Sequence, residues 1–320
     1  MDKLPLLVLE EVLKKVFEFL PREDRKAGVM VNSKWREVGE AGHLWAWVPL
    51  HVFDQNSRAR VIDMLSSERL ARVETIDIQP KAVSEDLLQA LINHTGLKSI
   101  GLWRWGREGR RDGLPAGLNP QLVVKALTAK VGDLRLGKHS LPTHLRIALF
   151  TELSQGGSFL KKIYLLRNNI SVVPEAFVAS ALTRMVEVRL EYTRLTSEQA
   201  IALTEGIDQG GSSIEKLYLR DSLPSMDERT GPLNLQPLVK LEKVRLDYNF
   251  LTELELVNFF AAMSPSTKLK RLRINSLPWP AKEVMDGSTG VMARAFNFLE
   301  EVELEGVHPY QVYNQQSPEV

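Results

Sequence analysis

Two stretches of the 320-residue chain, LKKIYLLRN at 160–168 and LEKVRLDYN at 241–249, share the spacing of apolar residues that decides the fold. In both, apolar side chains occupy the first, fourth and sixth positions. This six-residue pattern occurs nine times, at intervals of 24 to 34 residues. The copies begin at Val73, Leu97, Val131, Leu160, Met185, Ile214, Leu241, Leu269 and Leu299. A period of this length is typical of repeat proteins, in which each unit packs on its neighbours.

Each copy predicts a β-strand, because side chains alternate between the two faces of a strand. The fourth and sixth positions should face a core, and the third, fifth and seventh should face solvent. The segments between copies carry helix-start signals. Thr196 with Gln199 and Thr252 with Glu255 have the spacing of a capping box, and Ser84 precedes two acidic residues. A strand, a turn and a helix that recur about every 28 residues predict a parallel sheet with helices outside it.

This repeat resembles that of leucine-rich-repeat proteins of the long, helix-bearing kind, over roughly residues 70 to 307. The resemblance implies an α/β solenoid with a curved parallel sheet and outer helices. The family places Asn at the ninth position, where its side chain satisfies backbone groups in the turn. Asn168 and Asn249 hold this position here, and Thr193 and Ser222 are plausible substitutes. Three copies carry unsuitable residues, so some turns should be irregular: Lys81, Leu277 and Val307. The alternative is an ordinary α/β domain with chance periodicity.

The N-terminal residues predict a small helical module. The segment VLEEVLKKVFEFL at 8–20 has one continuous apolar helix face, and Pro21 ends the helix. Two further short helical segments follow, the first with Asp24 as its cap and the second carrying Trp35. Three helices in about 45 residues bury too little surface to be stable alone, so the module should pack against the first repeat or bind a partner.

The same residues resemble an F-box. The matching positions, in chain order, are Glu11-Val12-Leu13, Val16-Phe17, Leu20-Pro21, Asp24, Trp35 and Leu44-Trp45. Three residues depart from the family's pattern: Leu9, Arg25 and Asn32. The resemblance implies a surface that docks on the SCF adaptor, made of Leu9, Val12, Leu13, Val16, Leu20, Pro21 and Trp35. The departure at Leu9 touches the edge that meets the adaptor in the family. Alternatively, residues 1–50 only cap the open end of the solenoid.

These assignments divide the chain into an F-box at 1–50, a linker helix at 51–69, about nine leucine-rich repeats at 70–307 and a mobile tail at 308–320. The two resemblances together imply a substrate-recognition subunit of an SCF-type cullin–RING ubiquitin ligase, in the cytoplasm, the nucleus or both. Its F-box would dock on the SCF adaptor, and through it on a cullin, while the repeats hold the target protein. The alternative is a leucine-rich-repeat interaction scaffold or inhibitor with no role in ubiquitination.

The residue types in the chain argue against catalysis of its own. With no cysteine, the chain has no disulfide, no thiolate zinc site and no cysteine nucleophile for a ubiquitin thioester. No glycine-rich phosphate loop or G-x-S-x-G motif occurs either. We therefore expect a receptor without catalytic residues, cofactor or metal. A formal net charge of +1 and the lack of an 18-residue apolar run argue against a general nucleic-acid or membrane binder.

One candidate target-binding surface is the column of side chains at the fifth strand positions, on the concave face. The candidate residues are Arg135, Tyr164, Arg189, Tyr218, Arg245 and Arg273. Arg offers a fixed fork of donors for carboxylate or phosphate, and Tyr a flat apolar body with a polar tip. This column therefore predicts an acidic or phosphorylated target segment. The alternative is that these side chains pair with acidic neighbours across the sheet.

A second candidate surface is the longest segment between copies, the loop at 103–118. Trp103 and Trp105 stand there beside four arginines, a composition that suits a recognition loop. Equally, the segment could be an insertion with Trp103 packed against a neighbouring strand. Basic and aromatic residues together also permit nucleic-acid contact, although one such loop in a near-neutral chain makes this the weaker interpretation.

Overall fold

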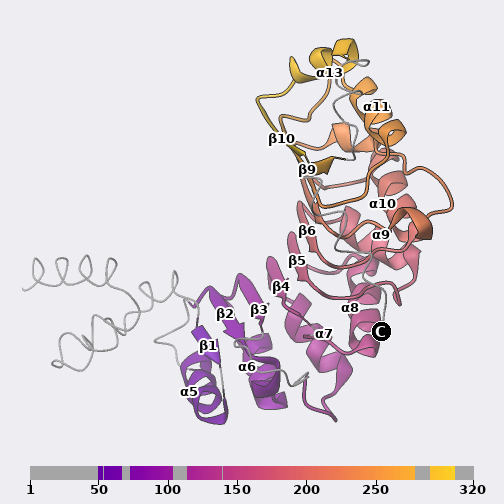
Figure 1. Cartoon of the computed structure of the whole chain (residues 1–320). Coiled ribbons are helices and arrows are strands. Elements are labelled where there is room, and N and C mark those ends of the chain that lie inside the picture. The colour runs from indigo at the N-terminus through magenta and orange to yellow at the C-terminus, as the bar shows by residue number, and fades with distance from the viewer. Residues whose placement is uncertain are drawn as a thin grey trace, which may run out of the picture. The chain divides into compact units, whose positions relative to one another are not determined.

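A computed structural model describes residues 50–52, 54–66, 73–103, 114–138, 140–277 and 289–306. They form an α/β fold in which parallel strands are flanked by helices (Figure 1). The chain divides into two compact units, Met1–Pro142 and Thr143–Val320. Across the described ranges, no helix has the length and apolar character needed to cross a membrane. The F-box residues, Trp105 and the C-terminal tail lie outside the described residues, so the predictions made for them stay predictions.

The strands of the first unit pair in parallel in chain order. Its described elements are β1 (Leu50–Val52), α5 (Gln55–Ser66), β2 (Thr75–Ile78), the 3-10 helix η2 (Pro80–Ala82), α6 (Glu85–Asn93), β3 (Ser99–Leu102), α7 (Pro120–Thr128) and β4 (Asp133–Leu136). Ile76 pairs with Ile100, which pairs with Leu134, so the core positions of successive copies are in register.

The expectation of one helix over 51–69 was wrong at its start. Leu50–Val52 form strand β1, which pairs with β2, and α5 begins only at Gln55. Asp54 begins this helix, because its carboxylate accepts a hydrogen bond from the backbone N–H of Ser57 at 2.8 Å. The side chains of Val61 and Leu65 on this helix are buried.

The second unit continues the alternation of strand and helix. Its elements are α8 (Thr143–Gln155), β5 (Lys162–Leu166), α9 (Glu175–Thr183), β6 (Glu187–Glu191), α10 (Ser197–Asp208), β7 (Lys216–Arg220), the 3-10 helices η3 (Met226–Glu228) and η4 (Gln236–Lys240), β8 (Lys243–Asp247), α11 (Glu253–Ala261), β9 (Arg271–Leu277), α13 (Thr289–Phe296) and β10 (Glu301–Gly306). The strands from β5 to β10 pair in parallel in chain order, and the helices lie on one side of them (Figure 1).

All nine predicted strands are present. The apolar side chains at the fourth and sixth positions are buried from β2 to β9, which confirms the predicted core face. In β10, the last strand, Val302 is 37% exposed. The capping boxes predicted at Thr196 and Thr252 also form, at the start of α10 and α11. Between β7 and β8, however, the expected helix is replaced by η3 and η4.

The turns after β5, β6, β7 and β8 share one geometry. The first turn residue has a positive φ near 50° in each, at Arg167, Tyr192, Asp221 and Tyr248. Its N–H donates to the carbonyl of the last paired residue of the next strand, as Tyr192 does to Arg220 at 2.7 Å. These four turns are therefore regular despite their different ninth residues. The segment after β2 differs, because η2 begins there.

The residues at the ninth position support these turns from inside. Their side chains, all buried, are those of Asn168, Thr193, Ser222 and Asn249. The Thr193 hydroxyl donates to the carbonyl of Leu165, and the Ser222 hydroxyl to that of Leu190. Thr193 and Ser222 thus do what an Asn side chain does at this position, as predicted, because a hydroxyl can also donate to a backbone carbonyl.

Candidate functional site

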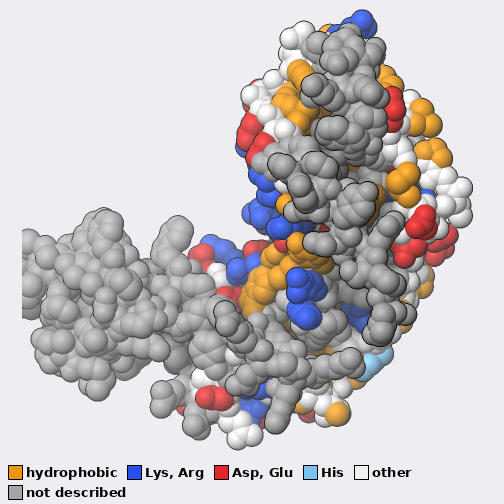
Figure 2. Space-filling view, in the orientation of Figure 1, with side chains coloured by type: hydrophobic (Ala, Val, Ile, Leu, Met, Phe, Trp, Pro, Cys, Tyr) orange, Lys and Arg blue, Asp and Glu red, His pale blue; other side chains and the backbone are white. Residues whose placement is uncertain are grey.

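The fifth-position side chains of the second unit form a continuous column on the face of the sheet that the helices leave uncovered. Tyr164, Arg189, Tyr218, Arg245 and Arg273 pair strand by strand from β5 to β9. The predicted column is therefore in register within this unit. In Figure 2, Lys and Arg side chains gather along the strands of this unit, with Asp and Glu beyond them toward β10.

The arginines of this column are held by acidic side chains of the same sheet. The guanidinium of Arg189 donates to Glu187, with Nε at 2.6 Å from the carboxylate. Arg245 and Arg273 both bind Asp247, which is fully buried, and Arg273 also binds Glu303 at 2.8 Å. The charge pairing that the sequence left as an alternative is thus present at three of the predicted binding residues. Their positive charge is largely compensated within the protein.

Arg135 lies in the first unit and is also paired. Its guanidinium is 3.8 Å from Asp77 and 3.7 Å from Asp133, and it donates to the Ser99 hydroxyl at 2.8 Å. In β3, the position between Asp77 and Arg135 is Gly101. Arg135 therefore ties β4 to the two preceding strands, while the carboxylate of Asp77 and the Trp103 ring occupy the space beside Gly101.

The two tyrosines of the column are half-buried among charges. Burial raises the pKa of Tyr164 to about 12, helped by the negative charge of Glu191 and a hydrogen bond to it and opposed by Arg189 and Arg220. Burial also raises the pKa of Tyr218. The ring of Tyr218 lies between Arg189, at 4.5 Å from its centroid, and Lys243, at 5.8 Å. Both phenols are thus neutral hydrogen-bonding groups at physiological pH.

A second row of basic and aromatic side chains, which was not predicted from the sequence, follows the ends of the same strands. It consists of Arg167, Tyr192, Arg220 and Tyr248, which we call the Arg–Tyr rim. Tyr192 has the guanidinium of Arg167 at 5.1 Å from its ring centroid and that of Arg220 at 5.4 Å. Arg220 also lies 5.2 Å from the centroid of Tyr248. Arg167, Tyr192 and Tyr248 stand at eighth positions, which the strand pattern did not include, whereas Arg220 stands at a seventh position, which it did.

Trp103, the described part of the second candidate surface, packs on its neighbours. A Cβ added at Gly101 would come within 2.3 Å of the Trp103 ring, and one added at Gly137 within 2.9 Å. The indole therefore lies over both glycines, the packed arrangement that the sequence left as an alternative. Its predicted companion Trp105 lies outside the described residues.

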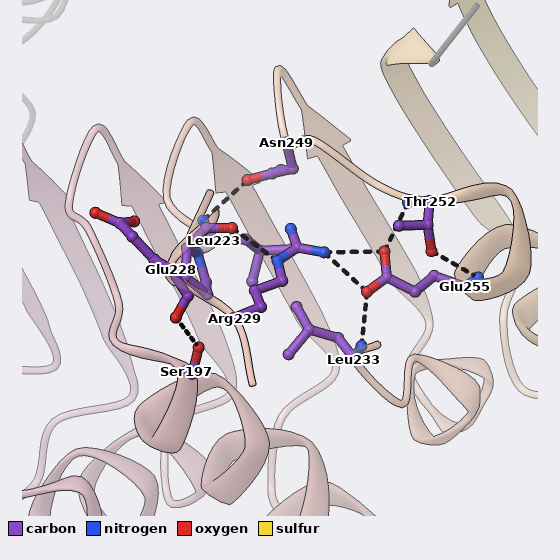
Figure 3. A network of polar contacts seen from close by, with 9 residues as sticks. Ser197, Leu223, Glu228, Arg229, Leu233, Asn249, Thr252 and Glu255 are labelled. Atoms are coloured by element: carbon purple, nitrogen blue, oxygen red, sulfur yellow. Dashed lines mark hydrogen bonds and ion pairs between the residues drawn. The ribbon is translucent and has the colours of Figure 1, made fainter. Parts of the chain in front are cut away.

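A buried ion pair fixes the segment that replaces the helix between β7 and β8 (Figure 3). Nη1 of Arg229 donates to both oxygens of Glu255, at 2.8 and 3.0 Å, and the two side chains are 4% and 0% exposed. Glu255 also accepts from the backbone N–H groups of Thr252 and Leu233. The Nε of Arg229 donates to the carbonyl of Pro224. One carboxylate thus joins the start of α11 to the preceding segment and supports the end of the sheet that carries the rim.

The described side chains offer no group of three or more His, Asp or Glu that could hold a metal ion. No protein-family model matches the chain, and no curated protein matches its sequence. The candidate site is therefore described from the structure alone. It consists of a parallel sheet face, on which most arginines form ion pairs with acidic side chains, and of the Arg–Tyr rim beside it.

Proposed function

We propose that the chain is a leucine-rich-repeat protein that binds a target polypeptide on the helix-free face of its sheet. The observation that carries this proposal is the register of the strands, which places side chains about 27 residues apart in sequence next to one another. The uniform turns and their buried Asn, Thr and Ser side chains support the leucine-rich-repeat assignment. A surface assembled in this way suits recognition of an extended partner.

We further propose that the protein is the substrate-recognition subunit of an SCF-type ubiquitin ligase, acting in the cytoplasm or the nucleus. Support comes from the F-box motif, whose residues follow one another in the family's sequence order between positions 11 and 45, and from the absence of cysteine, which leaves positioning of a target as the contribution to ubiquitination. The F-box would bind the adaptor, and the sheet face would hold the target at a fixed distance from the ligase.

Co-purification of the full chain with the SCF adaptor tests this role. Leu13→Glu/Val16→Glu places two charges on the apolar face of the first predicted helix, and adaptor binding should fall at least tenfold because a charge is costly to bury there. The matched control is Lys14→Gln/Lys15→Gln, on the polar side of the same helix, which should bind as the unaltered chain does.

If the unaltered chain does not bind the adaptor, the SCF role is contradicted and the alternative of a repeat scaffold or inhibitor is favoured. The departures from the F-box pattern at Leu9, Arg25 and Asn32 are the specific reason to keep that alternative. The target-binding role of the sheet face would stand in either case.

A further inference from the structure

We infer that the Arg–Tyr rim binds an acidic segment of the target protein, in a polyproline II conformation with carboxylates three residues apart. The inference rests on the proposed function, because it takes the sheet side of the second unit as the target-binding side. It differs from the prediction made for the fifth-position column, whose arginines are already paired with carboxylates of the protein.

The rim differs from the column in charge compensation. Within the part of the chain that the structure describes, Arg167 and Arg220 form no ion pair, whereas Arg189, Arg245 and Arg273 each do. Asp221, the residue after Arg220, experiences the charges of Arg194 and Arg220, which lower its pKa, although burial has the larger effect and raises it. The rim guanidiniums therefore keep donors for an external carboxylate, and charge complementarity selects an acidic partner.

The rim is also held in place before any partner binds. Tyr192 and Tyr248 sit at turn residues with a fixed positive φ, and the backbone N–H of each is bonded to the next strand. The guanidiniums of Arg167 and Arg220 lie 5.1 and 5.4 Å from the centroid of the Tyr192 ring, so both cations are held by the same ring. A surface fixed in this way loses little side-chain freedom when a ligand binds.

The spacing of the rim indicates the conformation of the segment. Arg167 follows β5 and Arg220 ends β7, so the two belong to strands that are two sheet spacings apart, about 9.6 Å. Three residues of a polyproline II helix advance about 9.3 Å. Carboxylates at positions i and i+3 can therefore reach both arginines at once, with the two residues between them against Tyr192. Tyrosine-lined surfaces suit such helices because these have little conformational entropy left to lose.

The test uses a fluorescein-labelled peptide of four Glu-Pro-Pro repeats, in which the acids recur every third residue. Its affinity for the full chain is measured by fluorescence anisotropy at low ionic strength, where exposed charges are least screened. A peptide with the same composition but with its four Glu residues adjacent is the ligand control. We expect the regular repeat to bind at least fivefold more tightly than the clustered one.

Two double variants locate the binding. Arg167→Gln/Arg220→Gln removes both rim cations and should weaken binding roughly tenfold or more, since each loses a charge-assisted hydrogen bond. Lys125→Gln/Lys130→Gln removes two exposed cations of the first unit, on and just after α7, and is the matched control, with an expected change of less than twofold. Circular dichroism and thermal unfolding establish that both variants are folded.

Equal losses in the two variants, or no binding by the unaltered chain, would overturn the inference. So would tighter binding of a single-stranded oligonucleotide of equal charge with the same dependence on Arg167 and Arg220, which would assign the rim to nucleic acid. None of these outcomes depends on the adaptor, so failure here is distinguishable from failure of the SCF role.

Discussion

Glu255 shows what a single residue contributes to this fold. Its backbone N–H closes the capping box of α11, and its carboxylate binds the buried guanidinium of Arg229 (Figure 3). The capping role could be predicted, because it depends on a spacing of three residues in the sequence. The ion pair could not, because Arg229 lies 26 residues away in a segment without a periodic pattern.

We predict that Glu255→Gln lowers the free energy of unfolding by about 3–5 kcal/mol, because the change leaves the buried Arg229 guanidinium without its counter-charge. Equilibrium unfolding in urea measures the loss. Lys240→Gln is the control. It removes an ion pair with Asp208 in which both side chains are about half-exposed, and such a pair contributes about 0–1 kcal/mol. Similar losses of unfolding free energy in both variants would contradict the prediction that the buried ion pair contributes more to stability than the exposed one.

At the scale of elements, the strands could be predicted from the local spacing of apolar residues, but the segments that connect them could not all be predicted. Every predicted strand is present because period-2 alternation with a buried face specifies a strand strongly. The helix expected between β7 and β8 is absent, in a segment that carries Pro224, Gly231 and Pro232. Strand β1 was missed because three residues are too short for any alternation to be visible, and pairing with β2 decides their conformation.

The turn after β8 gives a prediction at this scale. Asn249 is buried, donates to the carbonyls of Leu219 and Asp247, and accepts from the N–H groups of Ser222 and Leu223. Asn249→Ala leaves these backbone groups unpaired, so we expect a loss of at least about 2 kcal/mol in the free energy of unfolding.

Asn258→Ala is the matched control for Asn249→Ala, since Asn258 is exposed on α11. Its effect should stay within about 0.5 kcal/mol. Thermal and chemical unfolding of the two variants would show whether the turn side chains support the sheet. A loss at Asn249 no larger than at Asn258 would mean that they do not.

For the whole molecule, the sequence was sufficient to predict the repeating α/β fold but only part of the candidate site. The column of fifth positions could be predicted, because strand register follows from the repeat. The pairing of its arginines could not, since it depends on which neighbouring acids their long side chains reach. Three residues of the Arg–Tyr rim, Arg167, Tyr192 and Tyr248, lie at turn positions with positive φ, so no strand or helix period indicates them.

The proposed binding surfaces require that equivalent positions of successive repeats be neighbours, and the absence of cysteine allows a direct test. Lys216 and Lys243 are register partners in β7 and β8. Their Cα atoms should be about 4.8 Å apart, within the range that a disulfide spans.

We predict that Lys216→Cys/Lys243→Cys loses both free thiols under mild oxidation, as measured by thiol alkylation and intact mass. Lys216→Cys/Arg271→Cys joins strands two spacings apart, about 9.6 Å, and should keep both thiols free. An unbridged first pair, or a bridged second pair, would contradict the stacked register.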